Sequence, residues 1–470
     1  MFKRICTYVL ICVVFLSLLT GCEGYFSVGP SFSPELTSPT AQAPTATPET
    51  TPIISETVIG NPYEPNVSGE VIWTFNTSNA FQKRAAASLI KSFENKYPDA
   101  KVSLDSSAVS PARILSGTIG DIFYMEDAEV YKYAVTYNSL MPLDGYIASL
   151  QMDTTEIPEV IYKSGKVNNH IYYVASEYNQ LCFSYNKSVL SSLGLDLLVD
   201  NNWSWSTLHN IAKSVTEFTA DSGSPYYGAD IDLTYSPIYT ALLEISSNGT
   251  WCDMEGRKIT FADFMGNNLR LIEDCIVAAM SGYINPGIAS KTVGQPVFKI
   301  IRHGQVMEIS KEYDSKGVMW DFVAFPGLSQ ADNNHIISCS SSGFGVYNRT
   351  HNPDTAAVFA LHLYTEDGQL AFNGQPGGSV PTIKSIQNTD VWKYPDEADW
   401  TDKNWDAFIY QEQSSEYIIG QVVCRLPYII ASNIEDTMPK IISNVMNGNA
   451  ALYDEFVRLE TYCNELWSIL

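Results

Sequence analysis

A strand, a helix and a second strand follow one another near residue 70, and this order constrains the fold more than any other feature of the sequence. Residues 71–75 are a short apolar run, and residues 80–97 carry apolar side chains at helical spacing. Asn79 and Gln82 form a capping-box pattern at the start of this helix, and residues 102–104 read as the next strand. A strand–helix–strand unit predicts a parallel sheet with a right-handed crossover.

Polar residues follow two of the predicted strands. Asn76 and Asn79 come after the first strand, and Glu126 and Asp127 come after a buried-type strand at 121–125. In open α/β sheets, ligands bind outside the carboxyl ends of the strands, so these four residues are candidate ligand contacts. Helix capping is the alternative role, since helix N-termini prefer Asn and Asp.

The N-terminus carries a targeting segment. Lys3 and Arg4 precede an apolar stretch at 5–19, which is too short for a comfortable membrane span and has the build of a signal-peptide core. The following sequence LTGC, which ends at Cys22, resembles the lipobox of bacterial lipoproteins. The resemblance implies a signal peptide at 1–21 and a lipid on Cys22. The alternative is an ordinary secretory signal with an incidental cysteine.

A long polar stretch follows the cysteine. Residues 22–67 are rich in Pro, Thr and Ser, with few large apolar side chains. Such a composition does not repay the entropy of ordering, so we expect a disordered tether. The body is expected to span residues 68–470, which is a suitable length for two domains.

Charge and cysteine usage exclude several classes of partner. The chain has 52 acidic and 28 basic residues, for a formal net charge of −24. This charge repels polyanions, so we expect neither nucleic-acid binding nor electrostatic attachment to anionic lipid. The cysteines after Cys22 are scattered and contain no Cys-x-x-Cys pair, so a zinc site is not expected. We expect no cofactor either.

Catalytic motifs are missing from the sequence. The six histidines include no His-x-x-x-His pair, and the chain has no Gly-x-Ser-x-Gly elbow and no Gly-x-x-x-x-Gly-Lys loop. A glycoside hydrolase needs two carboxylates on either side of a bond, and the many acidic residues leave that alternative open. We expect a protein that is not an enzyme.

The order of the segments in the body resembles a known family. The relevant stretches are YNKSVLSSLG, WSTLHNIAKSV, HGQVMEISKEYD, WDFVAFPG, SSSGFGVYNRTHNPDTAAVFALHLY and GGSVPTIKS. This series is similar to the extracellular solute-binding proteins of ABC importers, in the branch that includes maltose-binding protein, and it covers nearly all of residues 71–470. The family often has Trp where this chain has Lys311, Glu312 and Tyr313, and Glu308 is more polar than usual.

The resemblance implies an α/β fold of the two-lobe periplasmic-binding-protein type. Each lobe is then a central sheet flanked by helices, and crossing hinge segments join the lobes and allow closure. The crossings are expected near 175–182, near 338–343 and somewhere after Ile383. Lobe one is expected at about 68–176 and 338–384, and lobe two at about 177–337 and 385–470.

Sugar sites combine aromatic rings, which cover the apolar faces of a pyranose, with polar groups that bond its hydroxyls. By the family match, Glu177 and Asn179 lie at the first crossing. Trp251 and Tyr313 are the candidate stacking residues, with Glu312 beside Tyr313. The backbone of a glycine-rich loop is also expected near the ligand, at Gly377, Gly378 and Ser379.

Other aromatic residues have more ordinary expected roles. Trp203 and Trp205 open a helix and are expected to pack inside a lobe. Trp320 and Phe322 alternate in strand fashion and are expected in the core. The polar stretch 390–406 has no assigned role, although it is a candidate for the rim of the cleft.

The sequence therefore predicts a lipid-anchored protein that binds a small solute between two lobes and delivers it to ABC permease subunits. A mono- or oligosaccharide is the expected ligand, and a polyol or a short peptide is an alternative. We expect a monomer on the outer face of a Gram-positive cytoplasmic membrane. A lipoprotein that reports its ligand to a membrane sensor kinase is a second alternative, because it uses the same closed, liganded form.

Overall fold

The computed structural model describes residues 63–254, 256–263, 265–327, 337–375, 378–393, 400–409, 417–419 and 426–470. They belong to one compact unit, Asn61–Leu470. The predicted signal peptide, Cys22 and the tether as far as residue 62 lie outside the described residues. Within the described ranges, no helix combines the length and the apolar character needed to cross a membrane.

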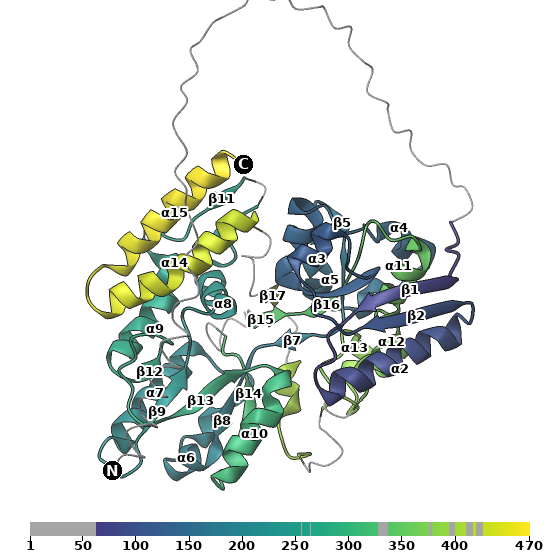
Figure 1. Ribbon diagram of the computed structural model, residues 1–470. Helices are drawn as coiled ribbons and strands as arrows, with labels where there is room; N and C mark the ends of the chain where they lie inside the picture. Colours follow the sequence, from purple (N-terminus) through teal and green to yellow (C-terminus); the bar gives the residue numbers. More distant parts are fainter. Residues whose placement is uncertain are drawn as a thin grey trace, which may run out of the picture. The chain divides into compact units, whose positions relative to one another are not determined.

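The first sheet has the strand order β2-β1-β3-β16-β6 (Figure 1). Its strands are β1 (Gly69–Thr74), β2 (Ala100–Asp105), β3 (Ile122–Glu126), β6 (Tyr173–Ala175) and β16 (Ser342–Val346). β1 is parallel to β2 and β3, whereas β16 is antiparallel to β3 and β6. The predicted strand–helix–strand unit is confirmed as β1, α2 (Ala80–Lys96) and β2.

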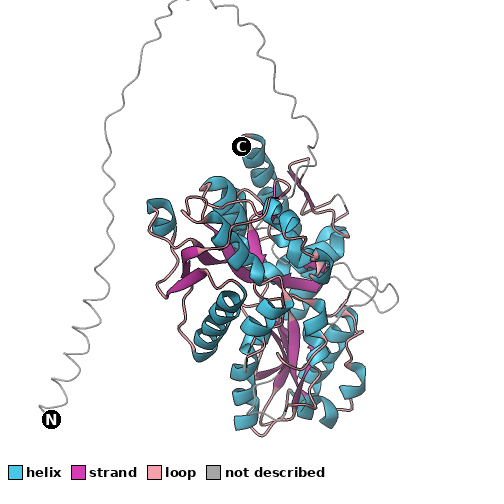
Figure 2. Cartoon of the chain, turned by 90° about the vertical axis from the view of Figure 1, so that its right-hand side faces the viewer, coloured by secondary structure: helices cyan, strands magenta, loops and turns pink. Residues whose placement is uncertain are grey.

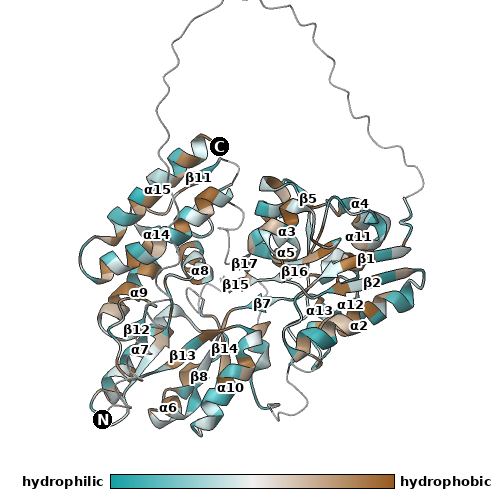
Figure 3. Cartoon of the chain, in the orientation of Figure 1, coloured by the Kyte–Doolittle hydropathy of each residue, from teal (hydrophilic) through white to brown (hydrophobic). Residues whose placement is uncertain are grey.

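Helix α2 shows why this unit forms. The Asn79 side chain accepts a hydrogen bond from the Gln82 backbone N–H at 2.8 Å, and the Gln82 side chain accepts one from the Asn79 N–H at 3.3 Å. The helix buries Ala85, Leu89 and Phe93, which repeat at helical spacing. Figure 3 shows the resulting mixture of hydrophobic and hydrophilic residues along α2.

Six further helices belong to the first lobe. They are α3 (Pro111–Ser116), α4 (Asp144–Ser149), α5 (Glu159–Ser164), α11 (Pro353–His362), α12 (Glu366–Asn373) and α13 (Lys384–Gln387). A small hairpin of β4 (Lys166–Val167) and β5 (His170–Ile171) precedes β6. Short turns of helix, η1 (Asp127–Glu129) and η2 (Lys132–Thr136), follow β3.

The second sheet has the order β12-β9-β13-β8-β14. Its strands are β8 (Cys182–Asn186), β9 (Tyr226–Asp230), β12 (Ile284–Asn285), β13 (Gln295–Ile301) and β14 (Trp320–Ala324). The helices of this lobe are α6 (Lys187–Ser192), α7 (Trp205–Thr219), α8 (Ser236–Ser247), α9 (Arg270–Met280), α10 (Val306–Ser315), α14 (Tyr428–Met446) and α15 (Leu452–Ser468). β10 (Cys252–Asp253) pairs with β11 (Lys258–Ile259), and η6 (His303–Gln305) precedes α10. Figure 2 shows the strands in the interior with helices around them, as the predicted α/β class requires.

Three short strands form a third sheet where the chain passes between the lobes. Their order is β17 (Tyr417–Ile419), β15 (Ile337–Ser340) and β7 (Asn179–Gln180). β7 connects β6 to β8, and β15 lies between β14 and β16 along the chain. β17 precedes α14, so three neighbouring segments link the two main sheets (Figure 1).

The buried apolar residues form two hydrophobic clusters, and the cluster on the first sheet also includes Trp320 and Phe322 of β14. Trp73 and Phe344 pack edge to face in the first cluster, and Phe183 and Trp203 do so in the second. The predicted packing of Trp203, Trp205, Trp320 and Phe322 is confirmed, because all four side chains are buried.

The described parts of the stretch 390–406, residues 390–393 and 400–406, contribute to the core. Trp392 and Trp405 are buried, and both surround the His303 ring together with Phe408 at centroid distances of 5.3–5.7 Å. Trp405 also packs on Phe322 of β14. Burial lowers the pKa of His303 to about 4, so this ring is neutral at pH 7.

The last residues assigned to the tether contact the first lobe. The Tyr63 hydroxyl donates to both carboxylate oxygens of Asp354 at 2.6 Å, and the Asn66 N–H donates to Asp354 at 2.8 Å. Asp354 stands in the first turn of α11. The described body therefore includes residues 63–67.

Candidate functional site

A pocket of about 560 Å³ is lined by residues of both lobes and of the first crossing. Glu177 and Asn179 come from the crossing, and Ser342 and Ser379 come from lobe one. The polar lining from lobe two consists of Asp230, Asp232, Tyr235, Lys299, Arg302 and Gln305. Three of the predicted ligand contacts, Glu177, Asn179 and Ser379, thus lie in one pocket.

The pocket lies at the ends of strands. β9 ends at Asp230 and β13 ends at Ile301, and these two strands are parallel with Asp230 opposite Lys299. On the other side, Ser342 begins β16 opposite Glu126, the last residue of β3. The site therefore follows the rule that α/β sheets bind ligands outside the carboxyl ends of their strands.

Glu177 joins the crossing to lobe one. Its Oε1 accepts hydrogen bonds from the Asn179 side chain and from the Ser342 hydroxyl, each at 2.8 Å. A carboxylate accepts up to about four hydrogen bonds, so Glu177 keeps capacity for ligand hydroxyls. This residue is both oriented by its neighbours and available to a ligand.

Two further carboxylates come from the end of β9 and the loop after it. Asp230 Oδ1 accepts from the Tyr227 hydroxyl at 2.7 Å and from the Asn285 amide at 2.9 Å. Asp232 Oδ1 accepts from the backbone N–H and the hydroxyl of Thr234, at 2.9 and 2.6 Å. These bonds hold both carboxylates in fixed orientations, which lowers the entropic cost of binding a ligand.

Arg302 and Tyr235 form a pair in the same pocket. The guanidinium carbon lies 5.5 Å from the centroid of the Tyr235 ring, which is a cation–π arrangement. Burial raises the pKa of Glu126, the charge of Arg302 opposes this, and Glu177 adds to the increase. Predicted residue Glu126 is therefore within electrostatic reach of the pocket.

Glu312 bonds to lysines. Lys299 Nζ, which lines the pocket, donates to Glu312 at 2.6 Å, and Lys316 donates to it at 2.8 Å. Burial alone would raise the pKa of Glu312, but the bonds from these two lysines hold it below its usual value. In this arrangement Glu312 orients Lys299.

The two candidate stacking residues lie in hydrophobic cores instead of lining the pocket. Trp251 is 1% exposed, stacks on Phe261 and donates its indole N–H to Glu244. Tyr313 is 4% exposed and stacks on Trp320. The expectation that Trp251 and Tyr313 line the pocket is therefore corrected, since both rings are buried against aromatic neighbours seven to ten residues away.

Asp127 and Asn79 serve the fold of lobe one. The Asp127 carboxylate accepts from the Ser341 N–H at 2.8 Å, and its own N–H donates to the Ser341 carbonyl at 3.1 Å. Burial raises the pKa of Asp127 to about 7. Asn79 caps α2, as described above, whereas Asn76 is exposed just after β1.

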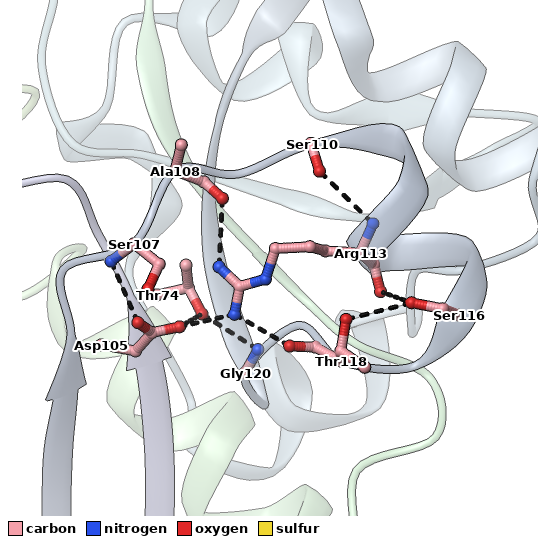
Figure 4. A network of polar contacts seen from close by, with 9 residues as sticks. All are labelled: Thr74, Asp105, Ser107, Ala108, Ser110, Arg113, Ser116, Thr118 and Gly120. Atoms are coloured by element: carbon pink, nitrogen blue, oxygen red, sulfur yellow. Dashed lines mark hydrogen bonds and ion pairs between the residues drawn. The ribbon is translucent and has the colours of Figure 1, made fainter.

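A second group of polar side chains in lobe one lies at the carboxyl ends of β1 and β2. Figure 4 shows Arg113 donating to Asp105 at 2.7 Å and to the Thr118 carbonyl at 2.8 Å. Asp105 also accepts from the Thr74 hydroxyl at 3.1 Å. Burial opposes ionisation, but hydrogen bonds from Ser107 and Arg113 hold the pKa of Asp105 below its usual range. These groups satisfy one another, which fits a structural role.

The glycine loop contributes one pocket residue. Gly377 lies outside the described residues. A Cβ at Gly378 would lie 2.0 Å from the Asn373 carbonyl oxygen, so close packing against the end of α12 requires glycine there. Ser379, the next residue, lines the pocket.

Sequence reasoning missed most of the lobe-two side of the pocket. Asp230, Asp232 and Arg302 directly follow apolar strand-like runs, which is the same signal that nominated Glu126. Applied to every strand, the carboxyl-end rule finds them. Across the part of the chain that the structure describes, no group of His, Cys, Asp or Glu is arranged to hold a metal ion.

Comparison with known proteins places this architecture in a family. A family model described as bacterial extracellular solute-binding protein matches residues 75–370. That span exceeds half of the chain, so the chain belongs to the bacterial extracellular solute-binding proteins. It is a solute-binding protein and not an enzyme. No curated protein sequence matches the chain.

Solved structures share the fold at low identity. An ABC substrate-binding protein from Listeria monocytogenes, in complex with cycloalternan, has a TM-score of 0.64 at 15% identity, covering 85% of this chain and 99% of that chain. The sugar-binding protein MalE from Xanthomonas citri has a TM-score of 0.66 at 13% identity, covering 85% and 98%. A cyclic alpha-maltosyl-1,6-maltose binding protein from Arthrobacter globiformis has a TM-score of 0.64 at 15% identity, covering 85% and 99%. The predicted two-lobe α/β fold is thereby confirmed.

Proposed function

We propose that this protein captures a carbohydrate in the pocket between its lobes and delivers it to the permease subunits of an ABC importer. The observation that carries the proposal is the composition of the pocket. Oriented carboxylates, an amide, a lysine, an arginine and a tyrosine converge there from lobe two and the crossing, together with two serines from lobe one. The sugar ligands named for the structural neighbours from Listeria and Arthrobacter support the same class.

The proposed contacts follow from hydroxyl chemistry. Glu177, Asp230 and Asp232 accept hydrogen bonds from sugar hydroxyls, and Asn179 and Arg302 donate to sugar oxygens. Tyr235 supplies a ring for an apolar sugar face. Because Ser342 and Ser379 of the same pocket come from lobe one, a ligand that bonds to them as well favours the closed form over the open one.

We also propose that the protein is a monomer, held by a lipid on Cys22 at the outer face of a Gram-positive cytoplasmic membrane. The LTGC sequence after an apolar run and the Pro-, Thr- and Ser-rich stretch behind it support this part of the proposal. We propose the lobe boundaries that the sequence analysis predicts, with about 68–176 and 338–384 in lobe one. The tether would leave the body next to Tyr63, on the lobe that contains α11.

A thermal-shift screen tests the carbohydrate proposal. The purified protein is heated with members of a panel of mono- and oligosaccharides, polyols and short peptides. A ligand at a hundredfold excess over its Kd stabilises the folded state by about 2.7 kcal/mol, which raises the unfolding midpoint. We expect a shift with at least one saccharide, which is recovered uncleaved. A shift only with peptides would replace the carbohydrate proposal.

The variant Arg302→Met links any shift to the pocket. Arg302 lies in the pocket and its removal takes away a donor, so the shift is expected to shrink or vanish. Arg458→Met is the matched control, because Arg458 pairs with Glu455 on the exposed face of α15. An equal shift in both variants would place the binding site elsewhere.

A further inference from the structure

A second pocket, of about 160 Å³, lies beside the segment that follows β3. From lobe one it is lined by Glu129, Tyr131 and Lys132, and from the start of α14 by Tyr428, Ser432 and Glu435. It therefore also has walls from both lobes.

Two chain segments carry residues near the first pocket and residues that line the second. On lobe one, burial raises the pKa of Glu126, and the charge of Arg302 in the first pocket opposes this increase. Glu129, three residues later in the chain, lines the second pocket. On lobe two, Tyr235 lines the first pocket, and the neighbouring Ser236 lies close enough to Glu435 of the second pocket to lower its pKa. Burial is the larger effect on Glu435 and raises its pKa above the usual value.

The second pocket has the two kinds of group that a sugar ring needs. Tyr131 and Tyr428 supply aromatic surface, and Tyr428 is 54% exposed although it lines the pocket. Glu129, Ser432 and Glu435 supply hydroxyl partners.

Lys132 of lobe one contacts the Tyr428 ring. Its Nζ lies 5.4 Å from the Tyr428 ring centroid and 5.2 Å from that of Tyr133. Glu129 accepts a hydrogen bond of 2.6 Å from the Tyr133 hydroxyl and lies 3.9 Å from Lys132. The second pocket is thus built from connected side chains.

We propose that the two pockets are the ends of one groove, and that the ligand is an oligosaccharide with one unit in the second pocket, stacked on Tyr428. This inference rests on the proposed carbohydrate function, which it narrows to ligands of at least two units. A single ring in the first pocket leaves the second pocket without sugar contacts.

The test compares affinity with chain length. Isothermal titration calorimetry on the full chain uses saccharide series of one to four units: α-1,4-linked glucose, β-1,4-linked glucose and β-1,4-linked xylose. In the series that binds, two or more units are expected to bind about two- to tenfold tighter than one, which is the range for one aromatic contact. Affinity independent of length would overturn the proposal.

Two variants assign the gain to the second pocket. Tyr428→Ala is expected to remove most of the length-dependent gain and to change monosaccharide affinity less than about twofold. Ser432→Phe, which fills the pocket from the same helix, is expected to do the same. Tyr453→Ala on α15, where Tyr453 is 41% exposed, is the matched control and should bind as the wild type does.

The outcomes separate this inference from the proposed function. Equal weakening of long and short saccharides by Tyr428→Ala would overturn the subsite, while binding of saccharides by the wild type would leave the proposed function in place. If no saccharide of any length binds to the wild type, the proposed function and this inference are both overturned.

Discussion

Replacing Glu177 by Gln removes one negative charge from the pocket while keeping the shape of the side chain. Glu177 Oε1 accepts from the Asn179 amide and the Ser342 hydroxyl, and a glutamine oxygen accepts the same two bonds. The variant should therefore fold, because the link between the first crossing and β16 is retained. What changes is the strength of the bonds that residue 177 accepts from the ligand.

The expected magnitude follows from the difference between charged and neutral hydrogen bonds. A bond to a charged acceptor contributes about 1.5–3 kcal/mol, and a neutral bond about 0.5–1.5 kcal/mol. The loss of about 1–1.5 kcal/mol corresponds to an affinity roughly five- to twelvefold weaker.

Isothermal titration calorimetry at pH 7 with the saccharide found in the screen measures this change. Glu156→Gln is the control, because Glu156 is an exposed residue of the short turn Thr154–Glu156 and should leave affinity unaltered. Thermal unfolding of each variant reports whether the fold is intact. A folded Glu177→Gln variant that binds within twofold of the wild type would refute the role given to this carboxylate.

Three other predictions address the core, the buried carboxylate and the anchor. Trp251→Phe should lower the free energy of unfolding by about 1–2 kcal/mol, because the bond to Glu244 is lost and the ring is smaller. Saccharide affinity should stay unchanged, and a clear loss of affinity in calorimetry would show that Trp251 contacts the ligand. The pKa of Asp127 is raised from 3.8 to about 7, so this carboxyl binds a proton more tightly in the folded state than in the unfolded state. The stability of the wild type relative to Asp127→Asn should therefore fall as the pH rises from about 4 to above 7. Denaturant titrations in which the two proteins keep the same difference in stability across this range would contradict the prediction. Cys22→Ser should release the protein from cells into the medium, as detected by immunoblotting of membrane and medium fractions, and a variant that stays with the membrane would contradict lipidation at Cys22.

Local patterns predicted the elements of the fold well. The capping box at Asn79 and the helical repeat of Ala85, Leu89 and Phe93 mark α2 correctly, because these contacts lie within a few residues of one another. The apolar strands 71–75 and 121–125 appear as β1 and β3 with shifts of one or two residues. Pairing of β1 with β2 and β3 follows from the right-handed crossover.

The site was predicted only where the chain itself places residues in the cleft. Glu177 and Asn179 lie on the segment that passes between the lobes, so their position follows from the crossing. Trp251 was misplaced because its environment is made by Phe261 and Glu244, and no local pattern distinguishes a buried indole from one in a cleft. Asp230 and Arg302 follow strand-like runs that mark them as candidates, but their meeting in one pocket depends on the pairing of β9 with β13, which is a long-range property of the sheet.

The most direct test of the central claim is a crystal structure of the protein with the saccharide that gives the largest thermal shift. The account predicts an intact sugar between the lobes, with hydroxyls within hydrogen-bond distance of Glu177, Asp230 and Arg302. A sugar bound outside this pocket, or recovered in cleaved form, would contradict it.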